Sequence, residues 1–392
     1  MLEHSPPLPI IIDYDEVDDD IPAEDEEGVL LSLEQRDRVR RIRLRLRAPI
    51  LQKLIVAINE EYPILEYLIL MSPGERNTTF TLPETLQAPH LRHIMLSGFA
   101  LPTGCRLIAT AVGLVTFFLA IVDPSTYVHP NTLLRWTSFM PQLQTLVVLF
   151  LYPVPNRDVE TQLKRTPIMT HATLPNLRVF VFRGSSAYME AVVPRITAPL
   201  LEKLEIAFFN QLTFTIPRLL QFMNTTENLR FSRADFVFSD DHVDVTVYPR
   251  EEAETYALSM TVDCWHLDWQ VSPAAQIFNE LNQILPTVEH LTFEHEVHSQ
   301  SSEEHNVVDR TEWRQLLRSF CNLKILHVDK GLVGELSRCL RLDDGELPLE
   351  LLPELQELTF SGGSDVDNAF IPFIDARRNA DRPVTLTRRW TP

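Results

Sequence analysis

The chain has 392 residues, 45% of them apolar, and a formal net charge of −19. Its 11 glycines argue against glycine-rich phosphate-binding loops, and its negative charge opposes an anionic nucleic-acid backbone, so we expect no nucleic-acid partner. Four scattered cysteines without a Cys-x-x-Cys pair predict neither a disulfide framework nor a zinc knuckle. This cysteine usage indicates a reducing intracellular setting, the cytoplasm or the nucleus.

Residues 1–34 form an acidic segment. Ten acidic residues lie between positions 13 and 27, with few apolar side chains to bury among them. Such a composition predicts a disordered tail. The first nine residues lack a basic region followed by an apolar stretch, so no signal peptide is expected.

The charge reverses immediately after this segment. Seven arginines between Arg36 and Arg47 alternate with apolar residues, which predicts a strand with its apolar side inward and its arginines solvated. A second interpretation is that Arg41, Arg43 and Arg45 form a basic edge, which the acidic tail or an acidic partner occupies.

One phrase, apolar-x-x-apolar-x-apolar, recurs over most of residues 35–392. Most steps between its first positions span 23 to 35 residues, and the first two steps are both 26. Those first positions are Val39, Leu65, Leu91, Leu114, Leu143, Leu177, Leu201, Val288, Leu323 and Leu355. This period is typical of leucine-rich repeats with helical segments between the strands. We therefore predict an α/β leucine-rich-repeat solenoid, with a curved parallel sheet on the concave side and helices on the convex side.

An uncharged stretch of sixteen residues, Leu107 to Val122, has to be compared with a membrane span. It is shorter than the roughly 20 residues that a bilayer requires, and it contains the repeat phrase. The stretch therefore predicts a buried helix followed by a buried strand.

Residues 229–262 depart from this repeat pattern. Apolar residues alternate on both sides of Ser239-Asp240-Asp241, which predicts an antiparallel hairpin and then a third strand near Leu258 to Val262. Ser272 before Pro273 predicts that a helix begins there. Near the end, Asn368 to Arg378 and Pro383 to Leu386 predict a helix and a strand that cap the solenoid.

Histidines and carboxylates gather between His290 and His305. Imidazole and carboxylate are zinc-type ligands, so an enzyme or metal-dependent protein using this segment is the alternative function. We find no Gly-x-Ser-x-Gly elbow, phosphate loop or His-Glu-x-x-His motif. The sequence therefore favours a binding protein over an enzyme, with no cofactor.

Several features together resemble the fungal F-box and leucine-rich-repeat proteins. They are the repeats, Leu-Pro or Ala-Pro before many strands, as at Leu174-Pro175, and the ending from Phe373 to Leu386. Members of that family carry an N-terminal F-box that docks on the ubiquitin-ligase adaptor. Leu8 to Ile12 resembles only its opening, so no F-box is recognisable, which puts binding of that adaptor in doubt. The resemblance implies a substrate-recognition component related to F-box ubiquitin-ligase receptors.

Alternation also predicts which residues the strands turn away from the core. At the fifth position of the phrase these are Arg43, Ile69, Met95, Phe118, Val147, Val181, Glu205, Thr292, His327 and Thr359. The third position is mixed and includes Arg41, Tyr67, His93, Val179 and Lys203. We expect a monomer without membrane contact. It is predicted to bind a protein partner through the apolar part of this column on the concave face. The alternative is that another segment of the chain covers these side chains, which would then be part of the internal packing. The predicted contact residues are Arg41, Arg43, Arg45, Tyr67, Ile69, Met95, Phe118, Val147, Val179 and Val181.

Overall fold

The structure is a computed structural model. It describes residues 8–15, 23–72, 79–102, 104–153, 156–209, 211, 214–226, 229, 231–249, 254–264, 267–281, 287–296, 310–342, 347, 349–361 and 368–389. The chain divides into two compact units, Met1–Leu201 and Glu202–Pro392, which are described separately.

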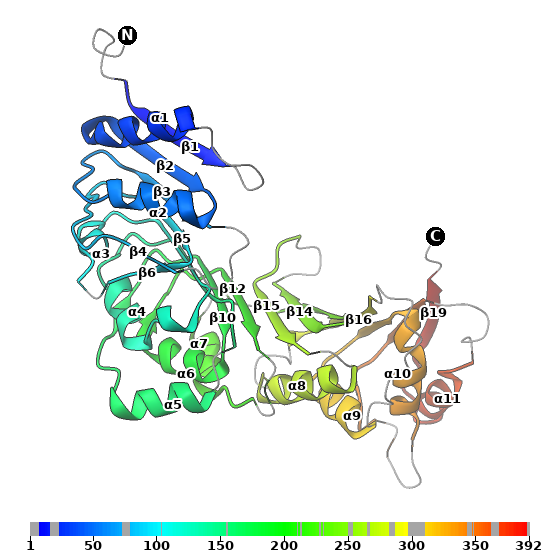
Figure 1. The fold of residues 1–392 in the computed structure, drawn as a ribbon. Helices are drawn as coiled ribbons and strands as arrows, with labels where there is room; N and C mark the ends of the chain where they lie inside the picture. Colours follow the sequence, from blue (N-terminus) through cyan, green and yellow to red (C-terminus); the bar gives the residue numbers. More distant parts are fainter. Residues whose placement is uncertain are drawn as a thin grey trace. The chain divides into compact units, whose positions relative to one another are not determined.

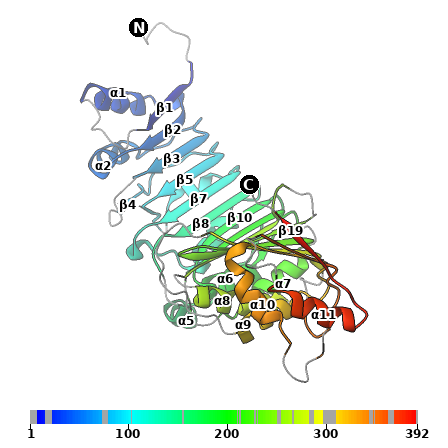
Figure 2. The same cartoon turned by 90° about the vertical axis from the view of Figure 1, so that its right-hand side faces the viewer.

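The first unit is built on a parallel sheet whose strands lie side by side in chain order (Figure 2). Its strands are β1 (Ile10–Asp15), β2 (Val39–Arg45), β3 (Tyr67–Met71), β5 (His93–Ser97), β7 (Thr116–Ile121), β8 (Thr145–Phe150) and β10 (Val179–Gly184). In-order parallel strands require a connection that returns over the same face each time, which is the arrangement of a solenoid.

Helices and short strands make those return connections. The helices are α1 (Ala23–Glu34), α2 (Ala48–Ala57), α3 (Arg106–Thr110), α4 (Pro130–Thr137), α5 (Asn156–Arg165) and α6 (Ser186–Val192), and α1 and α2 are seen along one side of the sheet in Figure 2. The short strands β4 (Phe80–Thr81) and β6 (Phe99–Ala100) pair with each other, as do β9 (Ala172–Thr173) and β11 (Ile196–Thr197).

A repeated turn leads into the strands. The amide of Leu91 donates to the carbonyl of Ala88 at 3.1 Å, and the same three-residue step recurs at Leu114, Leu143, Leu177 and Leu201. The next residue then bonds to the previous repeat, as where Arg178 N donates to Gln144 O at 2.9 Å. All ten predicted first positions are at most 2% exposed, so the phrase places each of them in the core. The predicted leucine-rich-repeat solenoid is confirmed.

The second unit repeats this plan with one interruption. Its strands are β12 (Lys203–Phe208), β13 (Arg233–Phe238), β14 (His242–Tyr248), β15 (Leu258–Asp263), β16 (His290–His295), β17 (Ile325–Val328), β18 (Glu357–Ser361) and β19 (Thr385–Arg389). Its helices are α7 (Pro217–Thr225), α8 (Leu267–Glu280), α9 (Arg310–Arg318), α10 (Val333–Leu340) and α11 (Ile371–Asn379). Helices α8 to α11 lie on one side of this sheet in Figure 1.

The interruption is the predicted hairpin, which the structure confirms together with its third strand. The strand order is β12-β15-β14-β13-β16, so the three-stranded meander runs backwards through the sheet. Strand β14 is antiparallel to both β13 and β15, whereas β15 is parallel to β12 and β13 is parallel to β16. Both outer strands of the meander are therefore parallel to the repeat strands beside them, and the repeats continue after the meander in the same direction.

Two predictions were wrong. The acidic segment is not disordered where the structure describes it, since β1 pairs with β2 and the helix α1 follows. Its few apolar side chains suffice: Ile12, Val29 and Leu33 are all buried. The rest of the predicted tail, residues 1–7 and 16–22, lies outside the described residues.

The helix α8 begins before Pro273 and contains it. The side-chain amide nitrogen Nε2 of Gln270 donates to the backbone carbonyls of Ser239 and Cys264 at 2.8 and 2.9 Å, and Val271 is fully buried. Packing of this earlier turn against the meander outweighs the cost of proline inside a helix, about 3 kcal/mol.

The remaining predictions on secondary structure agree with the structure. The range Leu107 to Val122 contains most of α3 and the strand β7, and no helix in the described ranges is long and apolar enough to cross a membrane. Helix α11 and strand β19 close the C-terminal end. The guanidinium of Arg377 is buried there and donates to the carbonyls of Leu352, Pro353 and Leu355. It therefore satisfies the last repeat turn, in which Leu352 has a positive φ of 50°.

Candidate functional site

The open face of the first unit's sheet carries a line of apolar side chains, which we call the apolar stripe. Ile69 pairs with Met95, Met95 with Phe118, and Phe118 with Val147, which pairs with Val181. The stripe therefore consists of Ile69, Met95, Phe118, Val147 and Val181. Each of these side chains is half-buried, whereas its neighbours along the strand point into the core. The predicted register is thus confirmed across five strands.

A parallel row lies two residues earlier on the same strands. Tyr67 and His93 stack there with ring centroids 4.5 Å apart, and Arg41 lies over the Tyr67 ring at 5.8 Å. His93 Nδ1 shares a hydrogen bond of 3.1 Å with Thr116 Oγ1. Burial, followed by the charge of Arg92, lowers the pKa of His93, so its ring is neutral at pH 7. The row then continues through Thr145 to Val179, which is also half-buried.

Arginines stand at one end of the stripe. Arg43 pairs in register with Ile69 and also faces Asp13 on β1. Asp13 Oδ2 is 3.4 Å from Arg41, and its Oδ1 is 3.3 Å from Arg43. Asp15 lies 2.5 Å from Arg43 and 3.6 Å from Arg45. The acidic segment therefore occupies the basic edge, as the second interpretation of the arginines expected.

These residues share one geometry. Arg41, Arg43, Arg45, Tyr67, Ile69, Met95, Phe118, Val147, Val179 and Val181 lie on one face of one sheet, half-buried or exposed. Rigid strands hold them in place, because the alternate residues of each strand are fixed in the core. The face therefore presents a line of apolar groups that ends at guanidinium groups, against which Asp13 and Asp15 lie.

The second unit presents a different surface at the corresponding positions. Lys203 Nζ lies 2.6 Å from Glu205 Oε1, and the Tyr256 hydroxyl donates to the same oxygen at 2.5 Å. Thr292 and His327 face outward and are half-buried. Thr359 is instead 2% exposed, because its hydroxyl meets His327 Nδ1 at 2.9 Å and the carbonyl of Leu326. The apolar part of the predicted column therefore belongs to the first unit.

The histidine-rich segment does not form a site where it can be followed. His290 lies mid-sheet beside Arg233 and Ile325. His295 packs so closely on Gly331 that a Cβ at that glycine would lie 2.6 Å from His295 Nδ1. His298 and His305 lie outside the described residues. Among the residues that are described, no group of three histidine, cysteine or carboxylate side chains could hold a metal ion.

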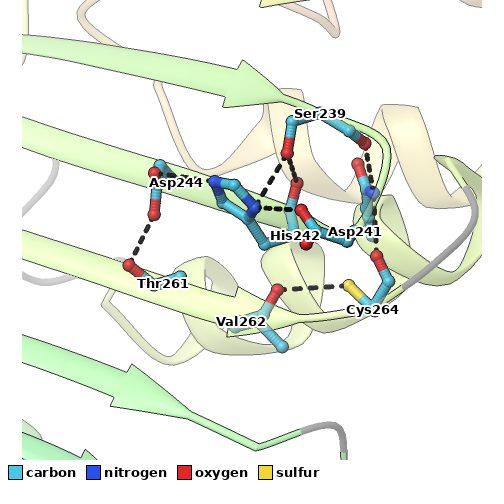
Figure 3. A network of polar contacts seen from close by, with 8 residues as sticks. Ser239, Asp241, His242, Asp244, Thr261, Val262 and Cys264 are labelled. Atoms are coloured by element: carbon cyan, nitrogen blue, oxygen red, sulfur yellow. Dashed lines mark hydrogen bonds and ion pairs between the residues drawn. The ribbon is translucent and has the colours of Figure 1, made fainter. Parts of the chain in front are cut away.

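The turn between β13 and β14, for which the sequence predicts only a hairpin, brings together a serine, a histidine and carboxylates (Figure 3). His242 Nδ1 lies 2.9 Å from Ser239 Oγ and 2.6 Å from Asp241 Oδ1, and its Nε2 lies 3.1 Å from Asp244 Oδ2. Thr261 on β15 donates to the other oxygen of Asp244. The short spacing Ser-x-Asp-His-x-Asp was the available signal.

The contacts of this cluster favour the protonated form of His242. Although burial opposes the charge, hydrogen bonds and the charges of Asp241 and Asp244 raise the pKa of His242 above 6.5. While the ring is protonated it has no free lone pair and cannot act as a general base toward Ser239. The cluster instead links the turn to β14 and β15.

A cavity of about 280 Å³ opens between α3 and α4, on the helical side of the first unit. Its lining includes Ile108, Trp136, Phe139 and the thiol of Cys105. Burial raises the pKa of Cys105, so the thiol stays protonated and is a poor nucleophile. The walls of the cavity are mostly apolar, with Arg135 also in the lining, and its thiol is protonated, so the apolar stripe is the stronger candidate site.

Comparison with known proteins gives a distant resemblance. No family model matches the chain, and no curated protein matches it. The solved structure of the leucine-rich repeat-containing protein LegL7 from Legionella pneumophila is similar at 12% sequence identity, over 73% of this chain and 82% of that chain, with a TM-score of 0.29. The leucine-rich-repeat solenoid fold of this chain rests on its own repeated turn, strand and register.

Proposed function

We propose that this chain binds a protein partner through the apolar stripe. The observation that carries the proposal is the alignment of Ile69, Met95, Phe118, Val147 and Val181, which stay half-buried on the open face of one sheet. Water contacts these side chains without a polar group to compensate, so covering them with a partner is favourable.

The stripe has the size of an interface centre. Complete burial of one such side chain contributes about 1.5–3 kcal/mol, and these side chains are already half-buried. Association costs at least about 4 kcal/mol in lost freedom, so several members must be covered together. Aromatic residues and methionine are enriched at interfaces, which makes Phe118 and Met95 the expected anchors.

The test is the double substitution Met95→Glu with Val147→Glu. Both residues lie in the middle of the stripe, so a partner would have to bury two carboxylates. We expect loss of the partners recovered by affinity purification and mass spectrometry, with an unchanged circular dichroism spectrum. The matched control is Met169→Glu with Val56→Glu, since these residues are 83% and 68% exposed away from the stripe. An unchanged set of partners for the folded stripe variant would refute the proposal.

The finer role that we propose is recognition of substrates for a ubiquitin ligase, in the manner of F-box receptors. Its support is the sequence resemblance alone, and the segment before the repeats contributes β1 and α1 to the solenoid. Recovery of the ligase adaptor with the full-length chain would support this role. Recovery of other proteins without the adaptor would favour a plain scaffold.

We further propose binding without catalysis, by a monomer in the cytoplasm or nucleus. The free thiols of all four cysteines agree with a reducing compartment. Light scattering would test the monomer, and fluorescence microscopy of the tagged chain would test the compartment. Stoichiometric transition metal in the purified protein would instead favour the metal-dependent alternative.

A further inference from the structure

The spacing of the apolar stripe sets what can lie along it. Its members come from neighbouring strands that are hydrogen-bonded in an unbroken series, β3, β5, β7, β8 and β10. Neighbouring strands lie about 4.8 Å apart, so the four steps from Ile69 to Val181 span roughly 19 Å across the sheet. A partner segment must therefore offer apolar side chains at nearly this interval.

A helix meets this requirement and an extended segment does not. Apolar side chains three and four residues apart advance about 5.3 Å per step along a helix, which gives about 21 Å in four steps. Side chains on one side of an extended chain advance about 6.7 Å, which gives about 27 Å. Over four steps, the length along the helix differs from the length of the stripe by about 2 Å. The length along the extended chain differs from it by more than the spacing between two strands.

The width of the stripe agrees with a helix. On one side, the row through His93, Thr116 and Thr145 is polar. On the other side the row is mixed, since Met71 pairs with Ser97, Ser97 with Ala120, and Ala120 with Leu149, which pairs with Arg183. An amphipathic helix has an apolar stripe of about 100° bounded by polar residues, so one polar flank of such a helix would face the row of His93, Thr116 and Thr145.

Charge fixes the direction of the helix. Among the described residues at the β2 end, the three arginines Arg41, Arg43 and Arg45 meet two carboxylates, those of Asp13 and Asp15, which leaves one net positive charge within this group. The C-terminal end of a helix carries about half a negative charge. A helix with its C-terminal end and an acidic side chain over β2 therefore complements the stripe.

We infer that the partner presents an amphipathic helix of about four turns, whose apolar side chains at spacings of three and four lie along Ile69 to Val181. Its last turn carries an acidic residue that lies against Arg45. This inference rests on the proposed function, because it specifies what the same surface binds.

A displayed library of random 18-residue peptides tests both ideas on the full-length chain. Peptides are selected on the unmodified protein and counter-selected on Met95→Glu with Val147→Glu. We expect enriched peptides with apolar residues at i, i+3 or i+4, and i+7, and an acidic residue near their C-terminal end. They should bind the stripe variant about tenfold or more weakly, and the Met169→Glu, Val56→Glu control equally.

The outcomes separate the two proposals. Enriched peptides that alternate apolar and polar residues would overturn the helix while leaving the binding surface in place. Failure to select any peptide that distinguishes the stripe variant from the control would overturn both.

The charge argument has its own variant. Arg45→Glu should weaken binding of the selected peptides by about two- to fivefold, with the loss greatest at low salt. Lys53→Glu is the control, because Lys53 lies on α2 and is 63% exposed. An equal loss in both variants would overturn the assigned direction of the helix.

Discussion

Asp13 and Arg43 lie opposite each other on neighbouring parallel strands, with Asp13 Oδ1 3.3 Å from Arg43 Nη1. This pair joins the acidic segment to the arginine-rich strand. Two carboxylates alternate with three guanidinium groups along this edge, so each charge has an opposite neighbour. The pairing places a strand where composition predicts disorder.

The first prediction concerns this pairing. Asp13→Lys with Asp15→Lys places two ammonium groups beside three arginines, so β1 should separate from β2. We expect the amides of Ile10 to Asp15 to exchange hydrogen at least tenfold faster, while β7 and β8 stay protected. Adding Arg43→Glu and Arg45→Glu should restore protection. Unchanged exchange in the doubly substituted chain would show that Ile12 packing alone holds the strand.

The second prediction concerns Gly184, the last residue of β10. A Cβ there would lie 2.6 Å from the ring of Phe182, which is 1% exposed and packs against Phe150 and Tyr188. Gly184→Ala should therefore reduce the free energy of unfolding by about 1–3 kcal/mol in denaturant titrations. Gly113→Ala is the control, because a Cβ there meets no atom within 4 Å. Equal effects of the two substitutions would exclude the steric explanation.

The third prediction concerns Arg377. Arg377→Met keeps much of the side-chain volume but leaves the carbonyls of Leu352, Pro353 and Leu355 without this donor. We expect a loss of about 2–4 kcal/mol, detected as faster hydrogen exchange in β18 and β19. Arg378→Met should be nearly neutral, because Arg378 is 68% exposed and pairs only with Asp375 among its described contacts. A neutral Arg377→Met would mean that water replaces the guanidinium at these carbonyls.

The fourth prediction concerns pH. The pKa of His242 is raised above 6.5 in the folded chain, so its stabilising contribution is complete below about pH 6.5 and disappears as pH rises through the raised value. The charged group facing His242 across the hairpin is Asp263 on β15, in addition to Asp241 and Asp244 on its own turn and strand.

Denaturant titrations at intervals from pH 5.5 to pH 9 should show this loss of stability. Hydrogen exchange in β13 to β15, measured at the same pH values, should locate the loss in the second unit. His242→Asn should remove the pH dependence of that exchange, whereas the exposed His90→Asn should leave it unchanged. A pH dependence that survives His242→Asn would assign it to another group.

Much of the fold was determined by local sequence. The spacing of Leu91, Leu114, Leu143 and Leu177 defines the repeat, because each of these side chains closes a turn and enters the core. Alternation along each strand then decides which side chains face outward, so the register of Met95 with Phe118 could be predicted before any contact was known. These patterns are local, and the pairing of neighbouring strands in register follows from the same pattern in each repeat.

Only the tertiary structure decided the rest. The strand that places Asp13 beside Arg43 forms only when the acidic segment and the arginine-rich strand meet, because their charges then compensate each other. The start of α8 before Pro273 depends on Gln270 reaching carbonyls that lie 31 and 6 residues away. The reversed meander and the burial of Thr359 likewise depend on which strands become neighbours. The sequence by itself determined the repeat and the residues that face outward from each strand. Pairing between segments that are distant in the sequence decided which charges meet, where helices begin, and where the apolar stripe ends.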